Sequence, residues 1–242
     1  MKQSDLQHRV KILTKHGQSA EAQAILEPLG YGPAVLDQGR DDLVNWNGLR
    51  RQTSDLLAAQ KQATDIQEET EVAARTITTK FKRTGRRVFK NNEPALTQVG
   101  LYPPLWSRPK KSANGTEDGQ TEADQAHANG NRPSYSASAK IDRWLAHFAN
   151  ALELSEAEQA LLAARGWTSE RLTEALALVE AYAEADIDQK QKVKAYEDTA
   201  SAASAAAAAL AAWYLEARGY ILAEIADLPP KKRARIKKLL GL

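Results

Sequence analysis

Residues 199–215 read TASAASAAAAALAAWYL, seventeen positions without a charged side chain, ten of them Ala. A bilayer span needs about 20 strongly apolar residues, and Ala contributes little to insertion, so a membrane span is not favoured. Charged residues flank the stretch within one helical turn, namely Glu197, Asp198, Glu216 and Arg218. Because Ala has the highest helix propensity and a small side chain, the stretch predicts a helix that another helix approaches closely.

The Ala-rich stretch belongs to a longer helical pattern. No Gly or Pro occurs between Gly166 and Gly219, so nothing in the sequence breaks a helix over that range. Small and apolar residues recur there at alternating spacings of 3 and 4, the period of a coiled-coil seam. The predicted seam consists of Ala200, Ala203, Ala207, Leu210, Tyr214, Ala217 and Ile221. Since Ala lies nearly all round this helix, we expect it to be enclosed in a bundle or between subunits.

The first half of the chain shows the same pattern between Gly48 and Gly85, again without Gly or Pro. The predicted seam there includes Ile66, Ala73 and Ile77. Both patterns favour one continuous helix of about 55 residues in each half. A hairpin turning near residues 60–65 and 186–191 is the alternative, because these midsections are polar, although they lack turn residues.

An internal duplication organises the chain. QAILEPLGYGPAVL at residues 23–36 resembles QALLAARGWTSERL at residues 159–172, with a shift of 136 positions. Each half begins with a short amphipathic pattern, and Ser19 and Ser155 are predicted N-caps of a second short helix. Gly30 and Gly166 are predicted C′ glycines. We therefore expect an elongated all-α, coiled-coil-like bundle made of a first helical repeat over residues 1–102 and a second over residues 139–242.

Residues 103–138 are rich in Gly, Asn, Ser, Pro and charge, which predicts a linker. Its expected anchors are Tyr102, Leu105 and Trp106. An extended residue covers at most about 3.3–3.6 Å, so this linker is long enough to return along a helix of about 55 residues. A short antiparallel connection needs far fewer residues. The linker length therefore favours parallel repeats, or exchange of repeats between subunits.

The composition restricts the classes of protein. The chain has 242 residues, 43% of them hydrophobic, and a net charge of +2. It contains no Cys, and its four His residues lack metal-ligand spacing, so no metal site and no cofactor are predicted. The N-terminal residues lack the apolar run of a signal peptide, which predicts a cytoplasmic location. Non-classical export to a surface assembly is the alternative.

No catalytic motif is present: the sequence contains no P-loop, no dinucleotide-binding glycine pattern, no HExxH and no GxSxG. Two basic clusters occur, over residues 80–90 and 231–238. The structural explanation of these clusters is that cations near helix C-termini complement the helix dipole. The functional explanation is that they contact phosphate groups. The candidate polyanion contacts are Lys80, Lys82, Arg83, Arg86, Arg87, Lys231, Lys232, Arg233 and Arg235.

These features favour a non-enzymatic structural or scaffolding subunit that self-associates through its long helices, in a filament, a sheath or a shell. Homo-oligomers are the expected partners, with other proteins as a further possibility. The first alternative is a protein that binds nucleic acid or another polyanion through the basic clusters. The second alternative is a membrane-active helical protein that exposes its Ala-rich helix.

Overall fold

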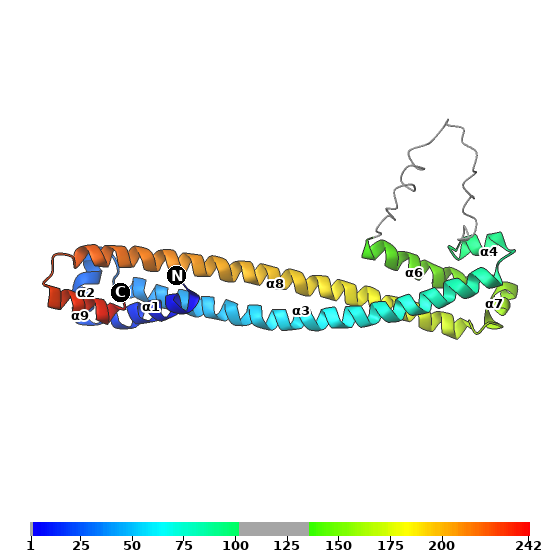
Figure 1. The fold of residues 1–242 in the computed structure, drawn as a ribbon, viewed down its shortest axis with the longest axis horizontal. Helices are drawn as coiled ribbons and strands as arrows, with labels where there is room; N and C mark the ends of the chain where they lie inside the picture. Colours follow the sequence, from blue (N-terminus) through cyan, green and yellow to red (C-terminus); the bar gives the residue numbers. More distant parts are fainter. Residues whose placement is uncertain (1, 102–135) are drawn as a thin grey trace, which may run out of the picture. The chain divides into compact units, whose positions relative to one another are not determined.

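The computed structural model describes residues 2–101 and 136–242, and every regular element within these ranges is a helix (Figure 1). The all-α prediction is therefore confirmed. The expected anchors Tyr102, Leu105 and Trp106 lie outside the described residues. The elements are α1 (Gln3–His16), α2 (Ala20–Leu26), the 3₁₀ turn η1 (Glu27–Leu29), α3 (Pro33–Val88), α4 (Glu93–Gln98), α6 (Ala137–Leu152), α7 (Glu156–Ala163), α8 (Ser169–Glu224) and α9 (Pro230–Leu240).

The two long helices, α3 and α8, are each continuous over 56 residues. The hairpin alternative is wrong, because residues 60–65 and 186–191 are helical throughout. Within residues 186–191, Asp186 is buried and bonded to Gln67 of α3, so a polar residue there does not indicate a turn. None of the described helices is long and apolar enough to cross a membrane.

The two halves of the sequence contain the same series of helices. Adding 136 to the bounds of α3 gives the bounds of α8. Ser19 and Ser155 both cap a short helix by accepting a backbone N–H three residues on. Gly30 and Gly166 have φ angles of 83° and 79°, a left-handed conformation that favours glycine and ends the short helix. The following aromatic residue, Tyr31 or Trp167, is buried in both halves.

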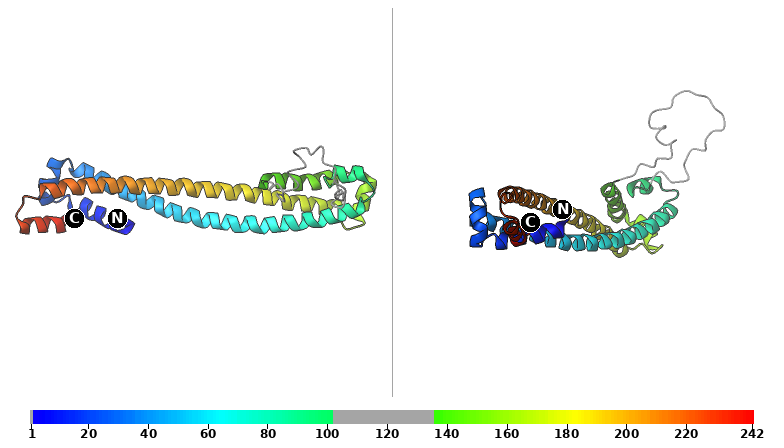
Figure 2. Two further views of the ribbon diagram at one scale, coloured as in Figure 1. Left: turned by 45° about the horizontal axis from the view of Figure 1, so that its top comes forward. Right: turned by 60° about the vertical axis from the view of Figure 1, so that its left-hand side comes forward.

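Packing divides the chain differently from the duplication. One compact unit, unit 1, combines Met1–Lys61 with Gln191–Leu242, and the other, unit 2, comprises Gln62–Lys190. Each unit therefore contains the start of one repeat and the end of the other. Figures 1 and 2 show a segment of α3 beside a segment of α8 within each unit.

The α3 and α8 segments run antiparallel within each unit. In unit 1, Gly39 of α3 lies against Trp213 of α8. Further along α3, Trp46 shares a hollow with Ala203, which comes earlier in α8 than Trp213. The residue numbers thus rise along α3 as they fall along α8. The predicted parallel arrangement is therefore wrong. The length of the linker does not require parallel repeats, because α4, before residues 102–135, and α6, after them, belong to the same unit.

The core of unit 1 is built by α1, α2 and the start of α3 together with the end of α8 and α9. Leu13 and Leu36 from the first half and Tyr214 and Ile221 from the second are all buried in it. Tyr31 contacts Trp213 edge-to-face, with ring centroids 6.2 Å apart. Both halves of the sequence are needed to complete this core.

The core of unit 2 has an aromatic centre. The Phe81 ring lies 5.0 Å from Phe148 and 5.1 Å from Trp167, between centroids. Phe81 comes from α3, Phe148 from α6, and Trp167 from the segment before α8, so this core also combines both halves. Such aromatic pairs add about 0.5–1.5 kcal/mol each beyond the area that they bury.

We predict that residues 1–101 and residues 136–242, co-expressed as two separate chains, bind each other and regain the helicity of the intact protein. Each half alone exposes the apolar residues that the other covers, so each half alone is expected to aggregate or pair with itself. Affinity purification through a tag on one chain tests this. Stable, monomeric folding of either half alone would contradict the shared cores.

A second prediction concerns the close contact at Gly39. A Cβ atom there would lie 2.5 Å from the Trp213 ring. In unit 2 the residue equivalent to Gly39 is Ala175, and the residue equivalent to Trp213 is the smaller Ile77. Gly39→Ala should destabilise the protein by about 1–3 kcal/mol through overpacking, although Ala is the better helix former. Adding Trp213→Ile should offset most of this loss.

Gly48→Ala is the matched control for Gly39→Ala, because a Cβ atom at residue 48 meets nothing within 4 Å. That variant should gain up to about 1 kcal/mol from helix propensity. Denaturant unfolding measures all three variants. Equal stability changes for Gly39→Ala and Gly48→Ala would disprove the contact with Trp213.

Candidate functional site

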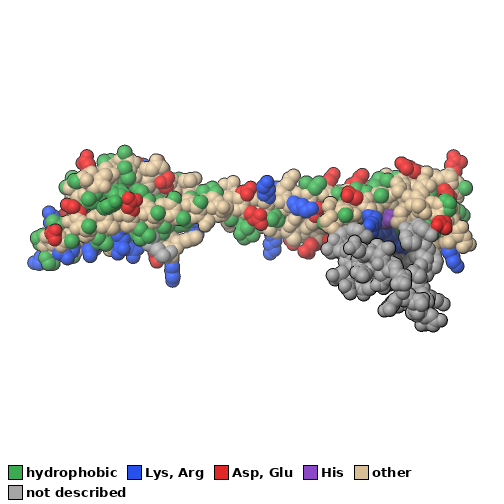
Figure 3. Space-filling view, turned by 90° about the horizontal axis from the view of Figure 1, so that it is seen from above, with side chains coloured by type: hydrophobic (Ala, Val, Ile, Leu, Met, Phe, Trp, Pro, Cys, Tyr) green, Lys and Arg blue, Asp and Glu red, His purple; other side chains and the backbone are tan. Residues whose placement is uncertain are grey.

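The Ala-rich stretch exposes one side of α8 in unit 1. Between Thr199 and Leu215 this side carries no charge, and Leu215 is 54% exposed. We call these exposed residues the outer Ala face: Ser201, Ala202, Ala205, Ala208, Ala209, Ala212 and Leu215. In Figure 3 hydrophobic side chains gather over the part of the molecule that contains the end of α8. The expectation that this helix is enclosed on all sides therefore does not hold within the single chain.

The opposite side of the same stretch is the predicted seam, and the structure brings its residues together. Ala203, Leu210, Tyr214, Ala217 and Ile221 are buried in unit 1, and Ala200 and Ala207 are half-buried. Their small side chains leave a hollow of about 260 Å³ beside Trp46, Arg50 and Thr53 of α3. The hollow is open, so the seam is not completely filled by this chain.

The predicted seam of α3 is only partly correct. Ile77 packs against the core of unit 2 and Ala73 is half-buried, but Ile66 is 48% exposed. Its neighbour Gln67 lies on the inner side instead, because its Nε2 donates a 2.8 Å hydrogen bond to Oδ1 of the buried Asp186. Lys190 donates to the other carboxylate oxygen at 2.5 Å. The buried carboxylate is thus paired on both oxygens.

The α9 cluster of basic residues lies in unit 1 and the α3 cluster in unit 2, so neither unit combines them. On α9, Lys231, Lys232 and Arg235 are exposed, and Arg235 pairs with Glu21 at 2.8 Å. Arg233 is half-buried and donates to the Leu228 carbonyl. Lys231, Lys232 and Arg233 occupy the first turn of α9, where cations oppose the helix dipole, so the dipole does not explain them.

The α3 cluster divides into two groups. Lys80, Arg83 and Arg87 are exposed, whereas Lys82 and Arg86 are half-buried. Burial, followed by the charges of Arg143 and Arg86, lowers the pKa of Lys82. Lys82 and Arg86 are one helical turn apart on α3, and α3 packs against α6 through Phe81 and Phe148. Arg143 lies on α6, so positive charges from two helices accumulate here.

His147 on α6 is 2% exposed and lies near these cations. Its Nδ1–H donates a 2.7 Å hydrogen bond to the carbonyl of Val99, and its Nε2 has no partner within the described ranges. Burial lowers the pKa of His147 to about 4; the bond to Val99 opposes this shift, and the charges of Lys82, Arg143 and Arg86 add to it. The imidazole is therefore neutral at pH 7. Its neighbourhood was not predicted, because hydrophobic periodicity does not register contacts between α3 and α6.

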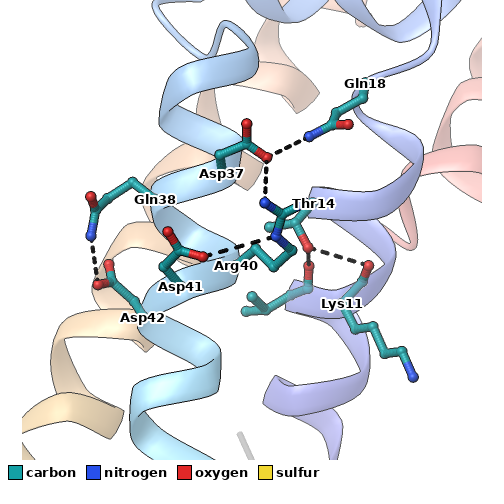
Figure 4. Close-up of polar contacts among 9 residues, drawn as sticks. Lys11, Thr14, Gln18, Asp37, Gln38, Arg40, Asp41 and Asp42 are labelled. Atoms are coloured by element: carbon teal, nitrogen blue, oxygen red, sulfur yellow. Dashed lines mark hydrogen bonds and ion pairs between the residues drawn. The ribbon is translucent and has the colours of Figure 1, made fainter.

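Asp37, Asp41 and Asp42, near the start of α3, make local polar contacts on the surface of unit 1 (Figure 4). Arg40 contacts Asp37 at 3.1 Å and Asp41 at 4.0 Å, and Gln38 donates to Asp42 at 2.9 Å. The described ranges contain no group of three or more His, Cys, Asp or Glu side chains placed to hold a metal ion. These carboxylates form a polar helix surface and do not converge on a shared site.

No known protein family, curated protein or solved structure matches this chain. The two repeats of the chain can, however, be compared with each other.

We predict that His147 makes the stability of the protein depend on acid. Its folded pKa is about 4, below the usual value of about 6.5, so between these pH values the unfolded state binds more protons. The contribution of neutral His147 is fully present above pH 6.5 and is lost as the pH falls toward 4. Charges facing His147 come from Lys82 and Arg86 on α3 and Arg143 on α6, and the residue after α4 supplies the Val99 carbonyl.

His147→Gln is the test variant, because a Gln amide can still donate to Val99 but does not titrate in this range. Denaturant unfolding between pH 7 and pH 4 should show a smaller loss of stability for this variant than for the parent. His8→Gln, on an exposed position of α1, is the control and should leave the pH dependence unchanged. Identical slopes for His147→Gln and the parent would refute the prediction.

Proposed function

We propose that this chain is a non-enzymatic structural subunit that self-associates by packing the outer Ala face of one copy against that of another. The observation that carries this proposal is the uncharged, exposed surface of α8 over residues 201–215. Exposed helix surfaces normally carry charged or polar side chains. A face of Ala and Leu allows a second helix to approach closely, and burial of each apolar Å² contributes about 25 cal/mol.

The other repeat shows that the fold does not require this face. Residues 65–79 of α3 correspond to residues 201–215 of α8 through the shift of 136. There, Ser201 is replaced by Asp65 and Ala205 by Glu69, and both acidic residues are exposed. The same helical position thus carries charge in one repeat and none in the other. Intermolecular packing accounts for that difference.

A second copy of the chain is the partner that fits best. Two outer Ala faces are complementary to each other, because neither presents a charge that the other must neutralise. The hollow beside Trp46 borders this face, since it is lined by the exposed Ser204, which lies one helical turn from Ser201 and from Ala208. A side chain of the second copy can fill the hollow. An isologous contact of this kind gives a dimer, and a further contact elsewhere is needed to extend it into a filament or shell.

Polyanion binding is the second candidate, and one observation favours it. Lys231 and Lys232, exposed in the first turn of α9, oppose the helix dipole, and neither forms an ion pair with a carboxylate among the described residues. A phosphate backbone is a suitable counter-charge. The proposed assembly does not use α9, so the two functions are separable by mutation.

We predict that Ala208→Glu abolishes self-association. It places a charge in the centre of the outer Ala face, and two such charges would be buried without partners in the dimer. Because residue 208 is exposed in the single chain, the helicity of the variant should not change. Light scattering coupled to size-exclusion chromatography measures the native mass.

Val72→Glu is the matched control, since Val72 is the equivalent exposed residue of the first repeat and is 64% exposed. The Val72→Glu protein should keep the mass of the parent. A parent protein that is monomeric at high concentration, or an Ala208→Glu variant of unchanged mass, would reject the proposed interface.

A further inference from the structure

We propose that Lys82, Arg86, Arg143 and His147 of unit 2 form a binding site for a small phosphate-type anion. Lys82 and Arg86 are a pair spaced by four residues on α3, and Arg143 and His147 are a pair with the same spacing on α6. Side chains four residues apart lie on one face of a helix. The two pairs influence one another electrostatically, and α3 and α6 pack together through Phe81 and Phe148.

Two polar atoms at this site are buried without a hydrogen-bond partner among residues 2–101 and 136–242. Arg86 Nε has no acceptor there, although a guanidinium donor normally finds one, and His147 Nε2 has no donor. Because Nδ1–H of His147 is bonded to Val99, Nε2 is the nitrogen left for a ligand. No carboxylate among the described residues forms an ion pair with Lys82 or Arg86. A bound oxyanion would satisfy the Arg86 donor and offset the mutual repulsion of the cations.

The other repeat indicates that folding does not require this cluster. In unit 1 the positions of Lys82 and Arg86 correspond to Arg218 and Leu222. Arg143 and His147 correspond to His8 and Ile12, because the first short helix is offset by 135 residues. His147 and Ile12 also have equivalent neighbours. Each lies against a glycine with positive φ, Gly100 in unit 2 and Gly241 in unit 1. Unit 1 thus packs an apolar Ile and a Leu where unit 2 has a His and an Arg.

The donor set favours phosphate over other anions. The Arg86 guanidinium and the Lys82 ammonium can donate to several oxygens of a tetrahedral anion, and Arg143 adds positive charge, whereas a carboxylate offers two oxygens only. Neutral His147 accepts a hydrogen bond at Nε2, and monohydrogen phosphate carries one O–H that can donate it. Sulfate has the same shape but no O–H at neutral pH. The site should therefore prefer phosphate to sulfate at pH 8.

The test uses the full-length protein and inorganic phosphate at pH 8, with the imidazole signal of His147 followed by nuclear magnetic resonance. The signal should shift in a saturable manner. Lys82→Ala combined with Arg86→Ala should weaken phosphate binding by about tenfold or more. The matched control combines Arg83→Ala with Arg87→Ala, which removes the same charge from exposed positions on the same turns of α3. This control should change the affinity by less than about twofold.

Selectivity provides a second readout that a purely electrostatic surface would not give. His147→Phe should remove the preference for phosphate over sulfate while keeping binding of both, since the cations remain. Glycerol 3-phosphate identifies the source of the anion: tighter binding than inorganic phosphate indicates a phosphomonoester, and weaker binding indicates free phosphate. Circular dichroism verifies that each variant folds. If the Lys82→Ala/Arg86→Ala variant does not fold, the single variant Lys82→Gln replaces it.

Three results would overturn the proposal. The first is an unchanged His147 signal at saturating phosphate. The second is an equal loss of affinity in the Lys82/Arg86 and Arg83/Arg87 variants, which would indicate general attraction to a basic surface. The third is binding of acetate as tight as that of phosphate, because the donor arrangement would then not recognise a tetrahedral anion.

Discussion

The antiparallel contact between α3 and α8 is the interaction on which both packing units depend. In unit 1 it places Gly39 against Trp213 and Ala203 beside Trp46, and in unit 2 it includes the bond between Gln67 and the buried Asp186. The short helices contribute Leu13 or Phe148 to cores that this contact creates. Because each unit needs residues from both repeats, neither repeat forms a complete unit of its own.

The duplication separates what the fold requires from what it tolerates. Features present in both repeats, such as the serine N-caps and the left-handed glycines, specify the helices and their ends. Features present in one repeat, such as the outer Ala face and the cations around His147, are not required for this packing. The proposed assembly surface and the proposed anion site are both of the second kind, and they lie in different units.

Periodicity and capping signals predicted the long helices, their glycine ends and the inner seam of α8. They did not predict the direction of pairing, because an apolar seam has the same spacing in parallel and antiparallel helices. Spacing alone places Ile66 in the seam, but Gln67 faces inward because it bonds to Asp186. Spacing along one helix does not reveal this bond, since the two residues are 119 positions apart in the sequence. The site around His147 was missed for a similar reason, since its members come from separate helices and only Lys82 and Arg86 belonged to a visible cluster.

Cross-linking between introduced cysteines tests the antiparallel pairing most directly, because the natural chain contains no Cys. A short bifunctional thiol reagent should join Gln67→Cys to Asp186→Cys within one chain, as these side chains are in contact. It should not join Gln67→Cys to Ala203→Cys, the pair of equivalent residues that a parallel alignment of the repeats would bring together. Mass spectrometry of dilute protein identifies the linked peptides. Efficient linkage of residues 67 and 203 without linkage of 67 and 186 would contradict the antiparallel fold.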